Sequence, residues 1–412
     1  MLTLDSRISS QPAISGIRPS ADSAGLATAT QGARGNGRFF ATENFHYQTL
    51  RALTEMSSGG AQLNDVLEAI KTIVDGDAQS WYAGWSALSD RTVAFAEQTH
   101  DTISKGNAYM RAHNYLRTAQ FMLPPEDPKR PGAWKKCLEY YLKGLDVLRV
   151  RCERISVPYR GGKLRAQYFP GTPGAEHKPL IMLVGGYDST LEELYPMLGK
   201  AGLERGYSVL AYEGPGQGQP LRDGVLMIPE WEKPTAAVLD EFLRTHAKPT
   251  KIVLIGMSMG GYFAPRAAAF ERRIDGVVAW NTCFDFGECA NMLAQKSLDP
   301  AASRTADYRW FAGNALWTTG TRTIEAATRA FSAYTLAPVA ARITQPVLIT
   351  AGENDYGIPL HQTADFQKAL VNAKSVTTRI FDRASGGAEH CQAGNGSLVH
   401  AAVFDWLAET FG

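Results

Sequence analysis

Short apolar runs recur through the second part of this sequence, and they constrain its fold more than any other feature. Six follow residue 152: KPLIMLVGG (178–186), GYSVLAYEG (206–214), KIVLIG (251–256), GVVAW (276–280), PVLITAG (346–352) and SVTTRIF (375–381). Most lack polar alternation, which is typical of strands buried on both faces by helices. Segments with helical spacing, such as TAAVLDEFLRTHA and the final AAVFDWLAETF, separate several of them. This alternation predicts an α/β fold with a mostly parallel, doubly wound sheet.

The remaining segments divide the chain into further parts. Residues 39–150 repeat apolar residues at three- and four-residue spacing, and they predict an all-helical cap domain. Residues 1–38 are rich in Ser, Gly, Ala and Thr, which indicates a flexible arm. The sheet domain is expected at 151–282 and 345–412. The helix-like insertion between its halves, 283–344, is expected to form a lid at the carboxyl ends of the strands, where open α/β sheets bind ligands.

Charge and composition exclude several classes of partner. The 412 residues include 42 basic and 41 acidic side chains, with no long run of one sign. We therefore expect no nucleic-acid partner and no polybasic membrane patch. No apolar stretch approaches the roughly 20 residues that span a bilayer, and the N-terminus lacks the pattern of a secretory signal. Five cysteines without a CxxC pair indicate reduced thiols, a cytoplasmic location and no zinc site.

A Gly-x-Ser-x-Gly motif joins one of the apolar runs to a helical segment. In KIVLIGMSMGGYFAPRAAA, Ser258 stands between Gly256 and Gly260 at the predicted turn from strand to helix. This setting displays a serine as a nucleophile, because the small neighbours let the backbone pack closely around a strained residue. We interpret Ser258 as the nucleophile of a hydrolase.

A serine nucleophile needs a base, and the base needs an orienting acid. In this architecture the chain order is Ser, acid, His. Asp355 follows the run PVLITAG and is the preferred acid, although Glu353 is a rival in the same loop. His390 follows the next run, in a glycine-rich loop before the final helix, and is the expected base.

Acyl transfer also needs hydrogen-bond donors for the oxyanion. The backbone N–H of Met259, directly after the nucleophile, is one expected donor. A second is expected from the loop LVGGYDST (183–190), through the N–H of Gly186 or Tyr187. The stretch EGPGQGQ (213–219) has the wrong spacing for a phosphate loop, and we interpret it as a Gly-x-Gly turn.

With these residues in place, the chain resembles the α/β-hydrolase superfamily from about 152 to 412. The helical N-terminal region, the GGYDST loop and the tail AEHCQAGNG (388–396) resemble one branch more closely. That branch contains 2,6-dihydroxypseudooxynicotine hydrolase and the fungal pigment hydrolases that shorten polyketide naphthopyrones. AEHCQAGN is the most specific element, whereas GMSMG is shared very widely.

The resemblance implies cleavage of a carbon–carbon bond beside a ketone, through an acyl-enzyme on Ser258 and without a metal or cofactor. Some members of the branch use an acidic residue near the substrate, and Glu288 is the nearest equivalent by position, although a solvated helix charge is the alternative. Tyr187 and Asp188 are further expected substrate contacts.

Two further readings of the function remain open. The same triad would serve an esterase, thioesterase, lactonase or polyketide acyltransferase, and a catalytically silent fold would only bind a ligand. The aromatic-rich helices and the lid suggest a large, flat, apolar small-molecule substrate of aromatic or polyketide type. The apolar surface of the helical region would also allow a homodimer.

Overall fold

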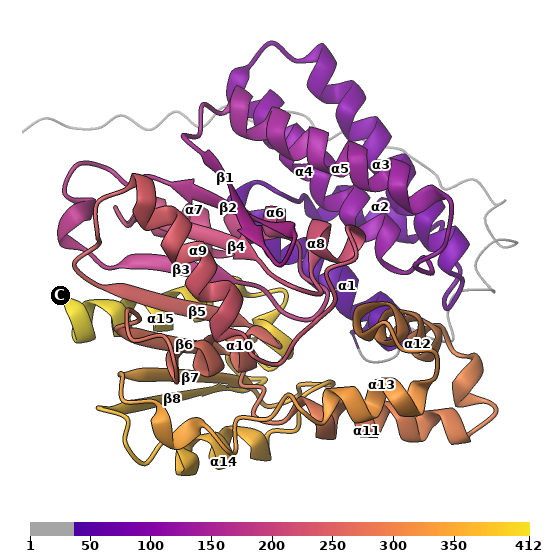
Figure 1. The fold of residues 1–412 in the computed structure, drawn as a ribbon. Helices are drawn as coiled ribbons and strands as arrows, with labels where there is room; N and C mark the ends of the chain where they lie inside the picture. Colours follow the sequence, from indigo (N-terminus) through magenta and orange to yellow (C-terminus); the bar gives the residue numbers. More distant parts are fainter. Residues whose placement is uncertain (1–36) are drawn as a thin grey trace, which may run out of the picture.

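An eight-stranded sheet forms the centre of the molecule (Figure 1). The computed structural model describes residues 37–412, so the arm predicted at 1–38 lies almost wholly outside the described residues. The strands are β1 (Glu153–Tyr159), β2 (Gly162–Phe169), β3 (Leu180–Val184), β4 (Val209–Glu213), β5 (Ile252–Met257), β6 (Gly276–Trp280), β7 (Val347–Gly352) and β8 (Val376–Phe381). They are ordered β1-β2-β4-β3-β5-β6-β7-β8; β2 pairs antiparallel with both of its neighbours, β1 and β4, and all other neighbouring pairs are parallel. The predicted mostly parallel sheet is confirmed.

Helices cover both faces of this sheet. Side chains alternate along β3: Leu180, Met182 and Val184 face one core, and Ile181 and Leu183 face the other. The first core includes side chains of α9 (Glu232–Thr245), α10 (Gly260–Ala268) and α14 (His361–Ala369). The second includes α6 (Leu191–Leu194), α7 (Lys200–Glu204) and α15 (Gly396–Phe411). Burial on both faces explains why the strands read as unbroken apolar runs.

Five helices precede the sheet and pack around a third core. They are α1 (Glu43–Thr54), α2 (Leu63–Ile70), α3 (Ala78–Gln98), α4 (Thr102–Phe121) and α5 (Lys129–Val147). Trp81, Trp85 and Tyr115 are fully buried in this core. Helix α1 also ends against the far end of the chain, because the hydroxyl of Thr54 accepts the N–H of Gly394 at 2.7 Å. Within residues 37–412, no helix has both the length and the apolar character needed to cross a bilayer.

Three helices lie between β6 and β7, and we call them the lid helices. They are α11 (Phe286–Gln295), α12 (Ala306–Thr319) and α13 (Ile324–Phe331). Helix α12 meets the start of α1 (Figure 1), where the carboxylate of Asp307 accepts the backbone N–H groups of Glu43 and Asn44 at 3.2 and 2.9 Å. This contact joins the N-terminal helices to the lid helices.

Candidate active site

Ser258 lies on the sharp turn between β5 and α10. Its φ angle is +59°, a left-handed conformation that is unusual for a residue with a side chain. A Cβ atom added at Gly256 would collide with the carbonyl oxygen of Gly260, and one added at Gly260 would come within 3.0 Å of the carbonyl oxygen of Gly185. The two glycines of the motif therefore permit the close packing that holds the serine in this strained position.

Ser258, His390 and Asp355 form a continuous chain of hydrogen bonds. His390 Nε2 lies 2.8 Å from Ser258 Oγ, and His390 Nδ1 lies 2.5 Å from Asp355 Oδ2. Both charged partners are shielded from water, since the side chain of His390 is 9% exposed and that of Asp355 is 3% exposed. The rival acid Glu353 is exposed and accepts the backbone N–H of Arg383 instead. The structure thus brings together the serine, the histidine and the preferred acid.

The carboxylate of Asp355 has three further donors. Its Oδ1 accepts the backbone N–H groups of Gly357 and Ile358, each at 2.8 Å, and its Oδ2 accepts the side-chain amide of Asn281. These bonds fix the orientation of the carboxylate toward His390. We did not predict Asn281, although its position directly after GVVAW, at the carboxyl end of β6, could have indicated it.

The protonated form of His390 is favoured inside this cluster. Burial alone would lower the pKa of the imidazole, but the charge of Asp355 and the hydrogen bond to it raise that pKa well above its ordinary value. In the neutral imidazole, the carboxylate selects the tautomer in which Nδ1 carries the proton, so that Nε2 can accept the proton of Ser258. The arrangement can therefore activate a hydroxyl nucleophile.

The turn formed by Gly185 and Gly186 packs directly against Ser258. A Cβ atom added at Gly186 would lie 2.7 Å from Ser258 Cβ. The side-chain amide of Gln217, which is 1% exposed, donates to the carbonyl oxygens of Gly185 and Gly186 at 2.9 and 2.6 Å. These bonds fix the turn that carries the predicted oxyanion donors Gly186 and Tyr187. Gln217 lies in the EGPGQGQ stretch, which we had interpreted only as a turn.

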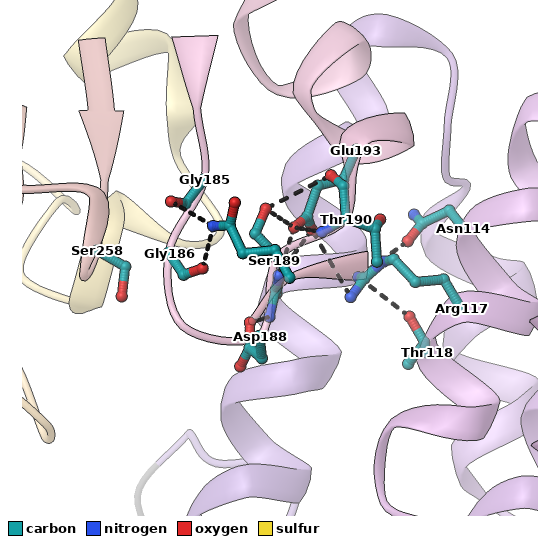
Figure 2. A network of polar contacts seen from close by, with 12 residues as sticks. Asn114, Arg117, Thr118, Gly185, Gly186, Asp188, Ser189, Thr190, Glu193 and Ser258 are labelled. Carbon is teal, nitrogen blue, oxygen red and sulfur yellow. Dashed lines mark hydrogen bonds and ion pairs between the residues drawn. The ribbon is translucent and has the colours of Figure 1, made fainter. Parts of the chain in front are cut away.

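A buried ionic network holds the next part of the same loop. Arg51 of α1 donates to Asp188 at 2.9 Å and to Glu193 at 2.7 Å. Glu193 also accepts from Ser189 Oγ and from the backbone N–H of Thr190. In Figure 2 the Gly185–Gly186 turn lies between Ser258 and this network. The N-terminal helices thus position a loop of the sheet domain.

The electrostatics of this network depend on two arginines. Burial alone would raise the pKa of Glu193, but the guanidinium groups of Arg51 and Arg117 lower it to about 2. Arg117 reaches the network from α4 (Figure 2), with a nitrogen 3.9 Å from Glu193. Glu193 is therefore ionised at neutral pH although it is almost fully buried. Nothing in the local sequence around Arg51 indicates these partners, which lie 137 and 142 residues away.

A cavity of 390 Å³ opens in front of Ser258. Its walls come from α1, from the lid helices α11 and α12, and from the loops that carry the residues described above. The aromatic residues that line it are Tyr47, Tyr187, Phe286, Trp310, Phe311 and Tyr356. The rings of Tyr47 and Tyr356 flank the imidazole of His390, with ring centroids 5.6 and 5.9 Å away. Such a space is suited to a largely apolar small molecule.

The other predicted site residues differ in where they lie. Met259, Gly186, Tyr187 and Asp188 all line the cavity. Glu288 does not: its carboxylate binds His361 at 3.0 Å and the amide of Gln362 at 2.7 Å, on the outer side of α11. The expected substrate contact of Glu288 is therefore corrected.

The position of Glu288 has a simple geometric reason. The residues of α11 that line the cavity are Phe286, Cys289 and Leu293, which follow one another at three- and four-residue spacing on one helix face. Glu288 precedes Cys289 by one position, which turns it by about 100° around the helix axis. Its side chain thus points toward α14.

Comparison with known proteins identifies the family. The chain matches the alpha/beta hydrolase family over residues 180–401. It is 30% identical to "Hydrolase acrC" of Aspergillus aculeatus, covering 91% of this chain and 98% of that protein. It is 29% identical to "20-hydroxy-prefusarin hydrolase FUS2" of Gibberella moniliformis, again over 91% and 98% of the two chains.

Solved structures share the fold. The 2,6-dihydroxy-pseudo-oxynicotine hydrolase superposes with a TM-score of 0.68 over 87% of this chain and 95% of its own, at 24% sequence identity. AbyA5 superposes with a TM-score of 0.64 over 87% and 94%, at 19% identity. With the family match and the relatives that span nearly its full length, this chain is a hydrolase that belongs to the alpha/beta hydrolase family.

Proposed function

We propose that this chain is a serine hydrolase that cleaves a carbon–carbon bond beside a ketone in an acylated aromatic or polyketide-type substrate. The observation that carries the proposal is the hydrogen-bonded chain from Ser258 through His390 to Asp355, at the base of an aromatic-walled cavity of 390 Å³. The nucleophile lies within hydrogen-bond distance of the base, and the base within hydrogen-bond distance of the acid, as covalent catalysis requires.

The proposed reaction has two stages. His390 Nε2 takes the proton of Ser258 as the hydroxyl oxygen adds to the ketone, and the N–H groups of Met259 and of Gly186 or Tyr187 stabilise the oxyanion. The tetrahedral adduct collapses to an acyl-enzyme, and the leaving carbanion, stabilised by a phenolic ring or a second carbonyl, takes the proton from His390. Water activated by His390 then adds to the acyl group, and Ser258 leaves with the proton to release the carboxylic acid.

The choice of a carbon–carbon bond rests on resemblance. The AEHCQAGN stretch around His390 and the helical N-terminal region are similar to the branch whose members cleave beside a ketone. The same hydrogen-bonded chain would also act on an ester, a thioester or a lactone, or transfer the acyl group to an alcohol. These reactions are the alternative outcomes of the test.

Product analysis separates these reactions. The full chain is incubated with 1,3-diketones, acylphenols and matched esters, and products are identified by mass spectrometry. We expect cleavage of the ketones to an acid plus a shortened ketone or phenol, abolished in Ser258→Ala and retained in Ser57→Ala, which changes an exposed serine. Turnover of the esters alone would refute the carbon–carbon assignment and leave the triad in place. Ketone cleavage by Ser258→Ala would refute the nucleophile.

A further inference from the structure

A second, smaller cavity of 50 Å³ borders the first. Tyr187, Asp188 and Trp310 line both cavities. The remaining walls of the small cavity come from the N-terminal helices α4 and α5, from residues 216–218 and helix α8 (Gly218–Arg222), and from the lid helix α12. It therefore lies where all three parts of the molecule meet, which is a common position for ligand sites.

Three arginines line this small space. They are Arg117 of α4, Arg130 of α5 and Arg222 of α8, and the first two are 4% and 9% exposed. A guanidinium carries five N–H donors. Among the described residues, Arg130 donates only to the carbonyl of Leu123 and Arg222 only to that of Gly218, while Nε of Arg117 has no partner. Most of the donors around the cavity thus lack a protein acceptor.

Two of these cations have no direct ion pair among the described residues. Within residues 37–412, no carboxylate oxygen lies within 4.0 Å of a nitrogen of Arg130 or Arg222. Glu192 and Glu213, whose charges act on Arg222, are bound to Arg165 at 2.8 and 2.5 Å.

Most of the carboxylates around the other two arginines are bound to other groups. Asp188, which lines the cavity, is bound to Arg51, and the Glu193 near Arg117 is bound to the same arginine. The charges of Glu126 and Asp127 act on Arg130 without forming an ion pair with it, and Asp127 accepts hydrogen bonds from Gln79 and from the backbone N–H of Lys129. The guanidinium donors of Arg130 and Arg222 are therefore not taken up by any of these carboxylates, and burying such donors without an acceptor is costly.

Aromatic rings hold two of the guanidinium groups in place. Arg222 lies over the ring of Trp134 at 3.9 Å, and Arg130 lies over the ring of Trp317 at 5.1 Å. Stacking of this kind fixes the planes and leaves the N–H edges free for bidentate binding. Burial also lowers the pKa of Arg130 to about 9 and that of Arg222 to about 10. The negative charge of an anion in the cavity would raise the pKa of both arginines again.

We propose that the small cavity is a carboxylate-binding site. A buried water needs about 10–15 Å³ of such space, so 50 Å³ holds roughly three or four non-hydrogen atoms. A carboxylate, with three, fits this volume, whereas a phosphate, with five, exceeds it. Because the small cavity shares the lining residues Tyr187, Asp188 and Trp310 with the Ser258 cavity, we assign the carboxylate to the substrate, at a point remote from the scissile bond. The assignment of the carboxylate to the substrate rests on the proposed function. The assignment of the small cavity as a carboxylate-binding site does not depend on it.

Acetate tests the site without turnover. The unfolding temperature of the full chain is measured in sodium acetate, in sodium chloride of equal ionic strength, and with acetamide as the neutral analogue. Acetate is expected to raise the unfolding temperature of the wild type more than chloride or acetamide does. The same difference is expected in the control Arg244→Gln, which changes an exposed arginine. The difference should disappear in Arg130→Gln and Arg222→Gln. No advantage of acetate in the wild type would overturn the site, whether or not the variants fold.

Kinetics test whether the carboxylate belongs to the substrate. Two diketones of equal length are compared, one ending in a carboxylate and one in a carboxamide. The carboxylate should raise kcat/KM by about 10- to 100-fold in the wild type, and the ratio should fall toward one in Arg130→Gln. A wild-type ratio near one would overturn the substrate assignment. If neither diketone is cleaved, the proposed function fails, and the acetate experiment still decides the site.

Discussion

Replacing Gln217 by methionine would test whether the Gly185–Gly186 turn is held in place for catalysis. Methionine has nearly the same length and volume, so the buried position stays filled. The change removes two donors to the carbonyls of Gly185 and Gly186 and the acceptor for the N–H of Gly214. The substitution changes no atom that takes part in the proposed reaction.

The expected losses follow from those three bonds. At about 0.5–1.5 kcal/mol each, they predict a fall of about 2–4 kcal/mol in the free energy of unfolding. Deleting an oxyanion donor typically costs about 10²–10³ in rate. In this variant the Gly186 and Tyr187 N–H groups would be displaced but still present, so we expect kcat to fall by about 10- to 100-fold.

A trifluoromethyl ketone separates positioning from simple destabilisation. It forms a hemiketal with the serine, and the hemiketal oxygen occupies the oxyanion position. Its affinity for Gln217→Met should fall by the same factor as kcat/KM, whereas the affinity for the product acid should change little. Urea unfolding measures the stability, and Gln79→Met, which changes an exposed glutamine, is the control.

One result would refute this reasoning. If Gln217→Met loses stability as expected but keeps kcat within about twofold, the turn does not depend on the amide for its catalytic geometry. The role of Gln217 would then be structural alone.

Three further outcomes follow from the same geometry. Asp355→Asn should lower kcat by about 10⁴-fold, because the imidazole loses its orienting partner, while Glu353→Gln stays near wild type; the reverse result would identify Glu353 as the acid. Because Asp355 raises the pKa of His390 and only the neutral imidazole is a base, kcat/KM should rise with pH through a midpoint above 6.5, and a midpoint at or below 6.5 would contradict this. Arg51→Met leaves Glu193 buried beside a single, more distant arginine, so urea unfolding should report a loss of about 3–5 kcal/mol, and a loss below 1 kcal/mol would contradict the network.

The fold was predictable because its signal is local. A strand buried on both faces must be apolar throughout, so KIVLIG and GVVAW indicated β5 and β6 from composition alone. The grouping of Ser258, Asp355 and His390 was similarly accessible, since each residue directly follows such a run or lies shortly after one. Parallel strands bring these positions to one edge of the sheet.

The supporting residues were not predictable in the same way. Gln217 and Arg51 are ordinary polar residues in their own segments, and they acquire a role only when a distant loop packs against them. The error at Glu288 has a different origin, because chain position near the lid's start does not tell which face of α11 a side chain occupies. One residue of helix rotation separates the cavity from the outer surface.

Helix α1 has a consequence for the order in which this protein becomes active. Its twelve residues, near the start of the described chain, contact Asp188, Asp307, His390 and Gly394, and Thr54 is 340 residues from its partner. Contacts of such sequence separation form late, because the intervening chain must first be brought together. During synthesis the N-terminal helices can fold early, but α1 cannot contact His390 and Gly394 until the last hundred residues emerge. Hydrolysis is therefore expected only after α1 has packed against His390 and Gly394. It is not expected while the sheet is still incomplete.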